Sequence, residues 1–363
     1  WYYLLGRSHE ADQALYGHYA DVRVAWSPDG NYIASAGDGP ARVWDAKTGK
    51  QLRCFDPGPT LKHGIGWSPD SKKLAWGSCS DESALRIWNR DTDQIAVVHG
   101  HESSIWSVAW SHDGKYVATG SISGGQSSPG NVRIWDVEKL ESVAQFTSPD
   151  HAQSVNWRSD DKLLAVAKSV DGRTIWDVAS LQQLPDIITK LASCAAWHPT
   201  DPQLAVGDNK GNCLIWDRRS QTAMLQWKAH QGQLNELKWN GDGTRLLSAG
   251  SDGMVKLWDA KTGRELKSVA AHAGLAQSVA WDPTGRRFAS SGTDGVIRIW
   301  TAESRPSPLV IDTKLQGTLD LAWDNESSGL LLASGDAGKI GVWEACSGKM
   351  LEEIPLRQDS NRR

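Results

Sequence analysis

The sequence predicts an all-β fold built from eight similar repeats, and the distribution of tryptophan is the first observation behind this prediction. The 363 residues include 20 Trp but only 6 Tyr and 3 Phe. Sixteen of these Trp form eight pairs that recur about every 42 residues, a period typical of stacked repeats. The first Trp of each pair lies at Trp26, Trp67, Trp110, Trp157, Trp197, Trp239, Trp281 and Trp323. The second lies at Trp44, Trp88, Trp135, Trp176, Trp216, Trp258, Trp300 and Trp343.

The second observation is a pattern of short strands joined by tight turns inside each period. Residues 244–258 contain two runs of β-branched and aliphatic residues around a Ser-Asp-Gly turn. Residues 27–30 (Ser-Pro-Asp-Gly) place Pro, Asp and Gly where a tight turn uses them, and residues 45–50 and 259–264 form a further turn. Each period therefore holds four short strands and almost no helix. A single sheet of this length cannot cover both of its faces, so neighbouring repeats must stack.

The repeats resemble the WD-repeat family, in which each period forms one blade of a β-propeller. Five second-position Trp are followed by Asp, whereas the other three repeats read Trp88-Asn89, Trp300-Thr301 and Trp343-Glu344. The resemblance implies a single eight-bladed β-propeller of four-stranded antiparallel blades over residues 1–363, with residues 1–10 as a leader and 357–363 as a tail. The Trp-Asp pairs are Trp44-Asp45, Trp135-Asp136, Trp176-Asp177, Trp216-Asp217 and Trp258-Asp259.

Closure of the ring is the one feature of this fold that the repeats leave open. Residues 12–16 and 350–355 are both candidates for an outermost strand, which makes nine candidates for eight blades. In the family the two chain ends join to close the ring. We therefore expect the N-terminal strand to complete the last blade.

Composition argues against several classes of partner. The net charge is −4 and the isoelectric point about 6.2, so no strong positive field favours nucleic acid. No apolar stretch approaches the length of a membrane span, and the five cysteines have neither disulfide nor zinc-ligand spacing. We expect a soluble, cytoplasmic protein that has no cofactor or metal and binds neither nucleic acid nor membrane. The cysteines are Cys54, Cys79, Cys194, Cys213 and Cys346.

The resemblance also implies a polar network inside each blade, made of a His, a Ser or Thr, an Asp and the second Trp. The third repeat has His101, Thr119 and Trp135 but lacks the Asp. Ser, His and Asp together suggest a hydrolase, but an active site is normally built once, whereas this set recurs with a structural Trp. We expect a structural role, no catalytic residues and no enzyme activity. The complete sets are His18/Ser35/Asp38/Trp44, His230/Ser248/Asp252/Trp258 and His272/Ser290/Asp294/Trp300.

Trp106 does not belong to the Trp pairs and is the strongest candidate for contact with a partner. It lies four residues before Trp110, near the start of an innermost strand, at a position that faces the central channel in the family. The third repeat also carries an insertion, SISGGQSSPGN, which we expect to project from the same face. Trp76 replaces the Ser or Thr of a repeat without the His, and we expect it to fill the vacated space. The predicted binding ring is Trp106, His63, Arg23 (or Val22), Gln153, Asn235, Gln277 and Leu319, with Ser193 at the equivalent place in the fifth repeat.

The sequence thus predicts a protein–protein interaction scaffold that binds partner proteins or peptides on the narrow face of the propeller. Its partners would be other proteins or other domains of the same chain. An alternative is the C-terminal sensor or regulatory propeller of a larger multidomain chain, attached to a kinase or a STAND-type switch ATPase. The absence of an initial Met favours that alternative.

Overall fold

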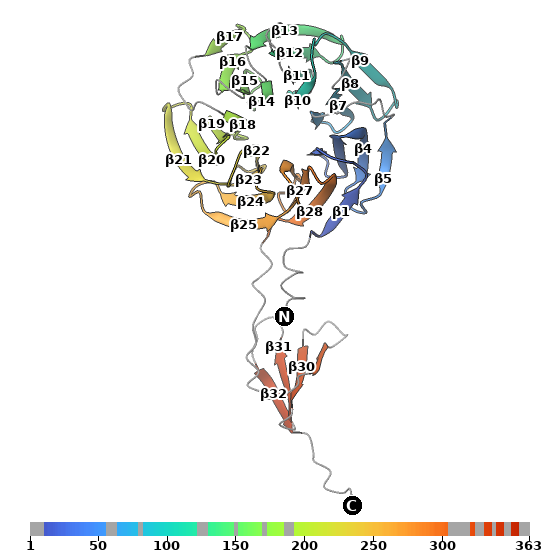
Figure 1. The fold of residues 1–363 in the computed structure, drawn as a ribbon, viewed down its shortest axis with the longest axis vertical. Helices are drawn as coiled ribbons and strands as arrows, with labels where there is room; N and C mark the ends of the chain where they lie inside the picture. Colours follow the sequence, from blue (N-terminus) through green and yellow to red (C-terminus); the bar gives the residue numbers. More distant parts are fainter. Residues whose placement is uncertain are drawn as a thin grey trace, which may run out of the picture. The chain divides into compact units, whose positions relative to one another are not determined.

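The computed structural model describes most of the chain up to residue 303 and four short strands after it. The described residues are 11–55, 64–78, 83–121, 130–148, 152–168, 173–184, 192–303, 320–323, 330–335, 339–344 and 350–355. Contact clustering divides the chain into two compact units, Trp1–Glu303 and Ser304–Arg363. The first unit is a ring of four-stranded antiparallel sheets around a central axis (Figure 1).

Each of the first six repeats forms one blade, in which consecutive strands pair from the axis outward. Blades 1 and 2 are β2(Arg23–Trp26), β3(Tyr32–Gly37), β4(Gly39–Asp45), β5(Gln51–Cys54) and β6(Ile65–Trp67), β7(Lys73–Gly77), β8(Leu85–Asn89), β9(Ile95–Val98). Blades 3 and 4 are β10(Ile105–Trp110), β11(Tyr116–Ser121), β12(Gly130–Asp136), β13(Glu141–Ser148) and β14(Ala152–Trp157), β15(Leu163–Lys168), β16(Arg173–Asp177), β17(Gln182–Leu184). Blades 5 and 6 are β18(Ala192–Trp197), β19(Gln203–Asp208), β20(Asn212–Asp217), β21(Thr222–Lys228) and β22(Leu234–Trp239), β23(Arg245–Gly250), β24(Met254–Asp259), β25(Glu265–Ala270).

The ring has seven blades, so the prediction of eight is wrong. Blade 7 combines β26(Ala276–Trp281), β27(Arg287–Gly292) and β28(Val296–Thr301) with β1(Gln13–Tyr16), which pairs antiparallel with β28. Its inner strand β26 contacts β2 of blade 1, and this contact closes the circle (Figure 1). The N-terminal strand therefore does complete a blade, but the blade belongs to the seventh repeat and not to the eighth.

The eighth repeat folds as a separate four-stranded sheet within the second unit. Its strands are β29(Asp320–Trp323), β30(Leu330–Gly335), β31(Lys339–Glu344) and β32(Met350–Pro355), paired in that order. The sheet has the antiparallel meander of a blade, as the repeat pattern predicts. The predicted outermost strand at 350–355 is thus used inside its own repeat, so neither outermost-strand candidate is spare.

Apolar side chains from neighbouring blades interleave to form the core of the ring. One buried cluster joins Leu15 and Ile297 of blade 7 to Val22, Ile33 and Trp44 of blade 1. Comparable clusters join blades 1 and 2, blades 2 and 3, and the later pairs. Burial of this kind stabilises a protein by about 25 cal/mol per Å² of apolar surface. It explains why each sheet needs a neighbour on both faces.

In blades 3, 4, 6 and 7 the first Trp of the pair joins adjacent blades through its indole N–H, whereas Trp26 donates to Gly30 of its own blade. Trp110, for example, donates to the carbonyl of Gly66 at 2.9 Å. Gly66 is the residue before the first Trp of the preceding blade. Trp157, Trp239 and Trp281 make the same bond to the preceding blade at 3.0–3.1 Å. A buried indole N–H needs an acceptor, and here the acceptor lies on the neighbouring sheet. The contact between blades therefore accounts for four of the first-position Trp.

Candidate functional site at the central cavity

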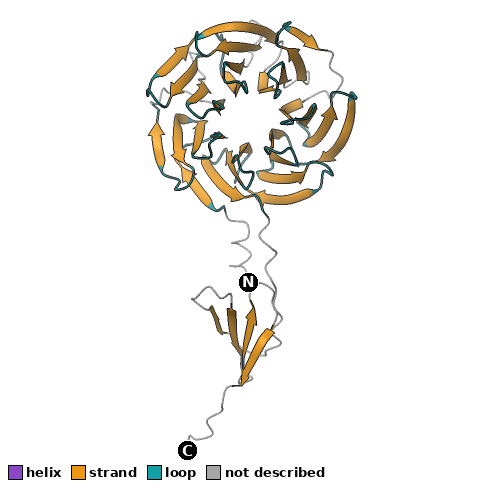
Figure 2. Cartoon of the chain, turned by 180° about the vertical axis from the view of Figure 1, so that it is seen from behind, coloured by secondary structure: helices purple, strands orange, loops and turns teal. Residues whose placement is uncertain are grey.

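The strand order in each blade gives the ring two different ends. Inner strands begin at one end, which we call the loop face; it carries the loops 17–22, 229–233 and 271–275 and the turns between second and third strands. Inner strands finish at the other end, which we call the turn face; it carries the turns between first and second strands, such as residues 111–115. Figure 2 shows the loops and turns in teal.

The predicted polar network is present in blades 6 and 7 with nearly identical geometry. In blade 6 the Trp258 indole donates to Ser248 Oγ at 2.8 Å, and that hydroxyl lies 2.7 Å from His230 Nε2. His230 Nδ1 lies 2.9 Å from the Asp252 carboxylate. Because Ser248 Oγ accepts from the indole, its own proton goes to His230 Nε2, and the imidazole then donates from Nδ1 to Asp252.

Blade 7 repeats this chain of donors and acceptors and adds a cation. Trp300 donates to Ser290 Oγ at 2.9 Å, Ser290 Oγ lies 2.9 Å from His272 Nε2, and His272 Nδ1 lies 2.8 Å from Asp294 Oδ1. The Arg298 guanidinium donates to the other oxygen of Asp294 at 2.7 Å. The carboxylate thus joins the histidine to an arginine.

The ionisation of these groups matches their hydrogen bonds. Burial lowers the pKa of His230 and His272, although the neighbouring carboxylates oppose this effect. Burial alone would raise the pKa of Asp252, but hydrogen bonds from the Gln231 amide and from His230 outweigh it, so that pKa is lowered. The histidines are therefore neutral and the aspartates charged near pH 7.

Blades 1 and 3 contain the inner part of the network. In blade 1, Trp44 donates to Ser35 Oγ at 2.9 Å, and Ser35 Oγ lies 2.8 Å from His18 Nε2. Asp38 is half-buried in the turn after β3, and its backbone amide donates to the carbonyl of Ala20 at 3.0 Å. In blade 3 the same chain runs from Trp135 to Thr119 at 2.8 Å and to His101 Nε2 at 2.6 Å.

The geometry also explains why these Ser-His-Asp sets do not resemble a working hydrolase site. The side chains of Ser35, Ser248 and Ser290 are completely buried, and each hydroxyl already accepts the indole proton of its own blade. A nucleophile must be reachable by substrate, and these oxygens are not. Their arrangement fixes a loop against a sheet.

Trp76 takes the place of this network in blade 2, as predicted. It pairs with Arg86, the register that Ser248 shares with Lys256 in blade 6. Its side chain is 1% exposed, and its ring lies 4.8 Å from that of Phe55. The Trp88 indole, which would otherwise donate to the missing hydroxyl, donates to Asp93 at 2.9 Å. A large apolar ring has replaced a polar cluster.

The predicted binding ring coincides with a β-bulge in the inner strands. In β10, Ile105 pairs with Ser121 and Ser107 with Gly120, so Trp106 is the extra residue of the bulge. The same irregularity falls at Gln153, Ser193, Asn235 and Gln277 in blades 4 to 7. A bulge turns a side chain away from the regular alternation of a strand. Trp106, Ser193, Asn235 and Gln277 accordingly line the central cavity.

The other four members of the predicted ring either lack the bulge or have side chains outside the described residues. In blade 1, whose inner strand has no bulge, Val22 is fully buried and Arg23 lines the cavity. The side chain of Gln153 lies outside the described residues, as do His63 and Leu319. The inserted segment of the third repeat also falls largely outside them, at residues 122–129.

Several of these cavity-lining side chains hold neighbouring blades together. Asn235 Nδ2 donates to the carbonyl of Ala276 at 2.8 Å, and Ser193 Oγ donates to that of Leu234 at 2.5 Å. Gln277 Nε2 donates to Asp21 Oδ1 at 3.0 Å across the joint that closes the ring. The residues predicted from sequence as partner contacts therefore also have a structural role.

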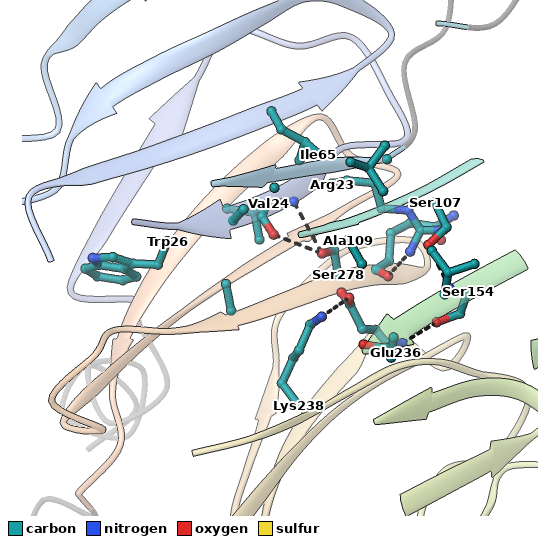
Figure 3. A pocket seen from close by; sticks show the side chains of 18 of the residues that line it. Arg23, Val24, Trp26, Ile65, Ser107, Ala109, Ser154, Glu236, Lys238 and Ser278 are labelled. Carbon is teal, nitrogen blue, oxygen red and sulfur yellow. Dashed lines mark hydrogen bonds and ion pairs between the residues drawn. The ribbon is translucent and has the colours of Figure 1, made fainter. Parts of the chain in front are cut away.

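The cavity itself measures about 670 Å³ and contains a small set of charges (Figure 3). Glu236 accepts the backbone amide of Val279 at 3.0 Å and lies 3.2 Å from Lys238. Arg23 donates to the carbonyl of Gln277 at 2.5 Å. Both signs are present, so the lining is mixed in character. The sequence analysis missed Glu236 and Lys238, although each follows Asn235 on the same inner strand.

Exposed apolar side chains lie on the loop face beside this cavity. Tyr19, in the loop 17–22, is 82% exposed, and Leu275, which lines the cavity, is 38% exposed. Trp106 is half-buried at the start of β10. Sequence patterns could not single out Tyr19 or Leu275, because exposure of one apolar residue in a loop depends on how neighbouring loops fold.

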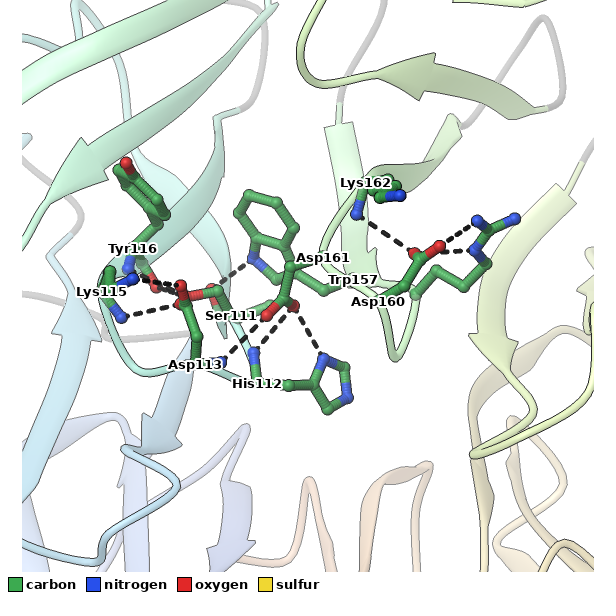
Figure 4. A network of polar contacts seen from close by, with 11 residues as sticks. Ser111, His112, Asp113, Lys115, Tyr116, Trp157, Asp160, Asp161 and Lys162 are labelled. Atoms are coloured by element: carbon green, nitrogen blue, oxygen red, sulfur yellow. Dashed lines mark hydrogen bonds and ion pairs between the residues drawn. The ribbon is translucent and has the colours of Figure 1, made fainter.

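The turn face is occupied by hydrogen-bonded carboxylates (Figure 4). Asp161 of blade 4 accepts the backbone amides of His112 and Asp113 of blade 3 at 2.8 and 2.9 Å, and His112 Nδ1 lies 2.9 Å from the same carboxylate. The Arg158 guanidinium donates to Asp160 at 2.8 Å and holds the pKa of that carboxyl below its usual value. These charges are satisfied within the ring.

Other chemistry is sparse in the part of the chain that the structure describes. It contains no group of three or more His, Cys, Asp or Glu side chains placed to hold a metal ion. It likewise contains no helix with the length and apolar character to cross a membrane. Cys54 is exposed, whereas Cys194 and Cys213 are buried, and burial raises the pKa of Cys194 to about 12.

Comparison with known proteins places these observations in a family. The model of the WD domain, G-beta repeat, matches residues 10–45, 92–136 and 263–301, which include the Trp pairs of blades 1, 3 and 7. These three segments are therefore WD repeats. A model of the IFT140 first beta-propeller matches residues 138–277. WD40 propellers are in general non-enzymatic modules that bind other proteins.

Individual relatives are distant. The chain is 25% identical to the WD repeat-containing protein WDS homolog of Arabidopsis thaliana, over 69% of this chain and 49% of that protein. It is 27% identical to the APC/C activator protein CDC20 of Saccharomyces cerevisiae, over 47% of this chain and 27% of that protein. It is 22% identical to eukaryotic translation initiation factor 3 subunit I of Drosophila mojavensis, over 48% of this chain and 58% of that protein. The chain spans about half or less of the length of most of these relatives.

Proposed function

We propose that this WD-repeat ring is a scaffold that binds a partner protein or peptide on its loop face, over the mouth of the central cavity. The observation that carries the proposal is the bulge at Trp106, which turns a large aromatic side chain to the cavity at a place where blades 4 to 7 carry small or amide residues. Trp and Tyr are the commonest anchors of protein interfaces. Tyr19 and Leu275 add exposed apolar area on the same face.

The rigidity of the ring supports this role. Asn235, Ser193 and Gln277 each bond to the next blade, so the rim of the cavity is fixed before a partner arrives. A rigid surface loses little conformational entropy on binding, which raises affinity for a given contact area. The mixed charges of Glu236, Lys238 and Arg23 suit a polypeptide better than a small anion. Relatives named as an APC/C activator and as a translation initiation factor subunit point to work in assemblies.

An affinity capture from lysate tests the proposal, using the wild-type chain, Trp106→Ala and Met224→Ala. Met224 is the matched control, because it is 54% exposed and lies on the outermost strand β21 of blade 5. We expect the wild type and Met224→Ala to enrich the same partner and Trp106→Ala to lose it while keeping the melting temperature of the wild type. A partner retained by Trp106→Ala but lost by Met224→Ala would place the interface on the outer rim and contradict the proposal.

We also propose a cytoplasmic location. The support is that Cys54, Cys194 and Cys213 are free thiols, as expected in a reducing compartment. Fractionation of the native host with an antibody to this chain tests it, and recovery in a secretory fraction would contradict it.

A further inference from the structure

Blade 3 contains a buried histidine whose second nitrogen lacks the acceptor that its counterparts in blades 6 and 7 have. Thr119 Oγ1 accepts from the Trp135 indole and lies 2.6 Å from His101 Nε2 but 3.5 Å from the carbonyl of Arg133. The shorter contact takes the hydroxyl proton, so the imidazole accepts at Nε2 and carries its own proton on Nδ1. That Nδ1 is buried and has no hydrogen-bond partner, and the His101 side chain is only 7% exposed. A buried donor left unpaired costs about 1–3 kcal/mol.

Blade 7 shows which group belongs at this position. Asp294 accepts from His272 Nδ1 at 2.8 Å and from Arg298 at 2.7 Å, and the aspartate side chain is 15% exposed. Arg298 stands two residues before Trp300, and blade 3 has Arg133 two residues before Trp135. Blade 3 therefore keeps both partners of the carboxylate, the histidine and the arginine.

The sequence of blade 3 has no carboxylate at the position of Asp294. Asp294 follows Ser290 by four residues, and the residue four after Thr119 is Ser123, which lies outside the described residues. The segment 122–129 reads ISGGQSSP and contains no Asp or Glu. A carboxylate for His101 therefore cannot come from the segment that supplies it in blades 6 and 7.

Arg133 is placed to help bind such a group. Its guanidinium carbon lies 5.7 Å from the centre of the Trp135 ring, and its Nε is buried with no hydrogen-bond partner. Its positive charge is close enough to His101 to reinforce the effect of burial, and together they lower the pKa of His101 to about 3. Gly100 lies beside both side chains: a Cβ there would come within 3.2 Å of Arg133 Nη1 and 3.0 Å of Trp135. The absence of a side chain at Gly100 leaves room for the arginine.

We propose that the loop face of blade 3 holds a carboxylate-binding site formed by His101 Nδ1 and Arg133, and that an Asp or Glu side chain of a partner protein fills it. The partner would thereby complete the network that Asp294 completes in blade 7. A carboxylate that receives hydrogen bonds from a guanidinium and an imidazole is bound by charge-assisted interactions, the stronger kind. The site stands on the geometry of blade 3 alone; its assignment to a partner protein rests on the proposed function.

Nitrogen NMR of the histidine side chains tests the site directly in the full chain. The ¹⁵N signals of His101 are assigned by comparison with His101→Gln and followed during titration with sodium acetate, with sodium chloride at equal ionic strength as the control. We expect acetate to shift the His101 Nδ1 signal in a saturable way. His272, whose carboxylate is already present, serves as the internal control and should not respond. Arg133→Met should weaken acetate binding about tenfold, because it removes a hydrogen bond to a charged group.

Two further probes distinguish a partner's side chain from a free carboxylate. N-acetyl-aspartate N-methylamide presents the carboxylate on a peptide backbone, and its asparagine analogue is the matched neutral control. We expect the aspartate compound to shift His101 at about tenfold lower concentration than acetate, and the asparagine compound to have no effect. Equal affinity for acetate and the aspartate compound would overturn the assignment to a protein partner.

The outcomes separate the site from the function of the ring. A His101 signal unchanged by both carboxylates would overturn the site, whatever Trp106→Ala does in the capture experiment. A saturable shift combined with an unchanged capture by Trp106→Ala would keep the site and reject the proposed binding face.

Discussion

Blades 3 and 7 share four kinds of side chain in register and differ in a fifth, an aspartate that only blade 7 has at this place. Both have a tryptophan, a buried hydroxyl, a histidine and an arginine in register, at Trp135, Thr119, His101 and Arg133 in blade 3. Blade 7 adds Asp294, which joins its histidine to its arginine. The chain from Trp to hydroxyl to histidine is intact in both blades. The comparison teaches that the hydrogen bonds from Trp to hydroxyl to histidine order the blade. The carboxylate is not needed for those hydrogen bonds to form.

The largest expected effect comes from making blade 7 resemble blade 3. Asp294→Ala removes the acceptor of both His272 and Arg298, so we expect the free energy of unfolding to fall by about 2–3 kcal/mol in urea denaturation. Asp91→Ala is the control, because Asp91 is 54% exposed and faces only Lys72 at 3.5 Å; its effect should stay within about 0.5 kcal/mol. Equal losses from both substitutions would show that the buried carboxylate is no different from a surface one.

A middle-sized effect is expected from the part of the network that the blades share. Trp258→Phe takes the indole donor from Ser248 in blade 6 and should cost about 1–3 kcal/mol. Trp135→Phe should cost a similar amount, since its bond to Thr119 has the same length of 2.8 Å. Thermal melting of both variants measures this. An unchanged melting temperature for Trp258→Phe would contradict a structural role for the network.

The smallest effect concerns pH and is expected from the histidine without a carboxylate. The pKa of His101 in the folded chain is about 3, below the unfolded value of 6.5. Unfolded chains therefore take up the proton first as pH falls, and stability present above pH 6.5 is lost towards pH 3. Each pH unit costs about 1.4 kcal/mol. The difference in unfolding free energy between wild type and His101→Gln should shrink by about 1 kcal/mol between pH 6.5 and 5.5, because half of the unfolded histidines are already protonated at pH 6.5. A constant difference would mean that His101 titrates normally.

The strands within each repeat could be predicted from the sequence, but the number of blades in the ring could not. The first six repeats and the eighth each form the expected four-stranded antiparallel sheet, whereas the described residues of the seventh supply three strands and β1 supplies the fourth. Trp323 and Trp343 of the eighth repeat match the other pairs in spacing, so nothing local shows that the ring closes with seven blades. Closure is set by which pair of blades meets, and that depends on long-range contacts such as Gln277 with Asp21.

The sequence predicted which residues line the central cavity, but it did not predict that some of them also bond to the next blade. Counting back from the first Trp of each pair identified the bulge residues, because the bulge recurs at the same place in blades 3 to 7. The count could not show that Asn235 and Ser193 bond to the next blade, since their acceptors are carbonyls about 41 residues away. Nor could it show that Val22 is buried in blade 1, where the bulge is missing.

The pairing of β1 with β28 has a consequence for how the molecule is made. Gln13 pairs with Ile299, so the first strand of the ring to be synthesised waits for the last one. The sheets of blades 1 to 6 are each built from one short stretch of chain and can fold as they emerge. Blade 7 cannot. Until synthesis passes residue 301, the nascent chain carries β1 without its partner, and a ribosome that stops earlier leaves an unpaired strand edge open to association with other chains.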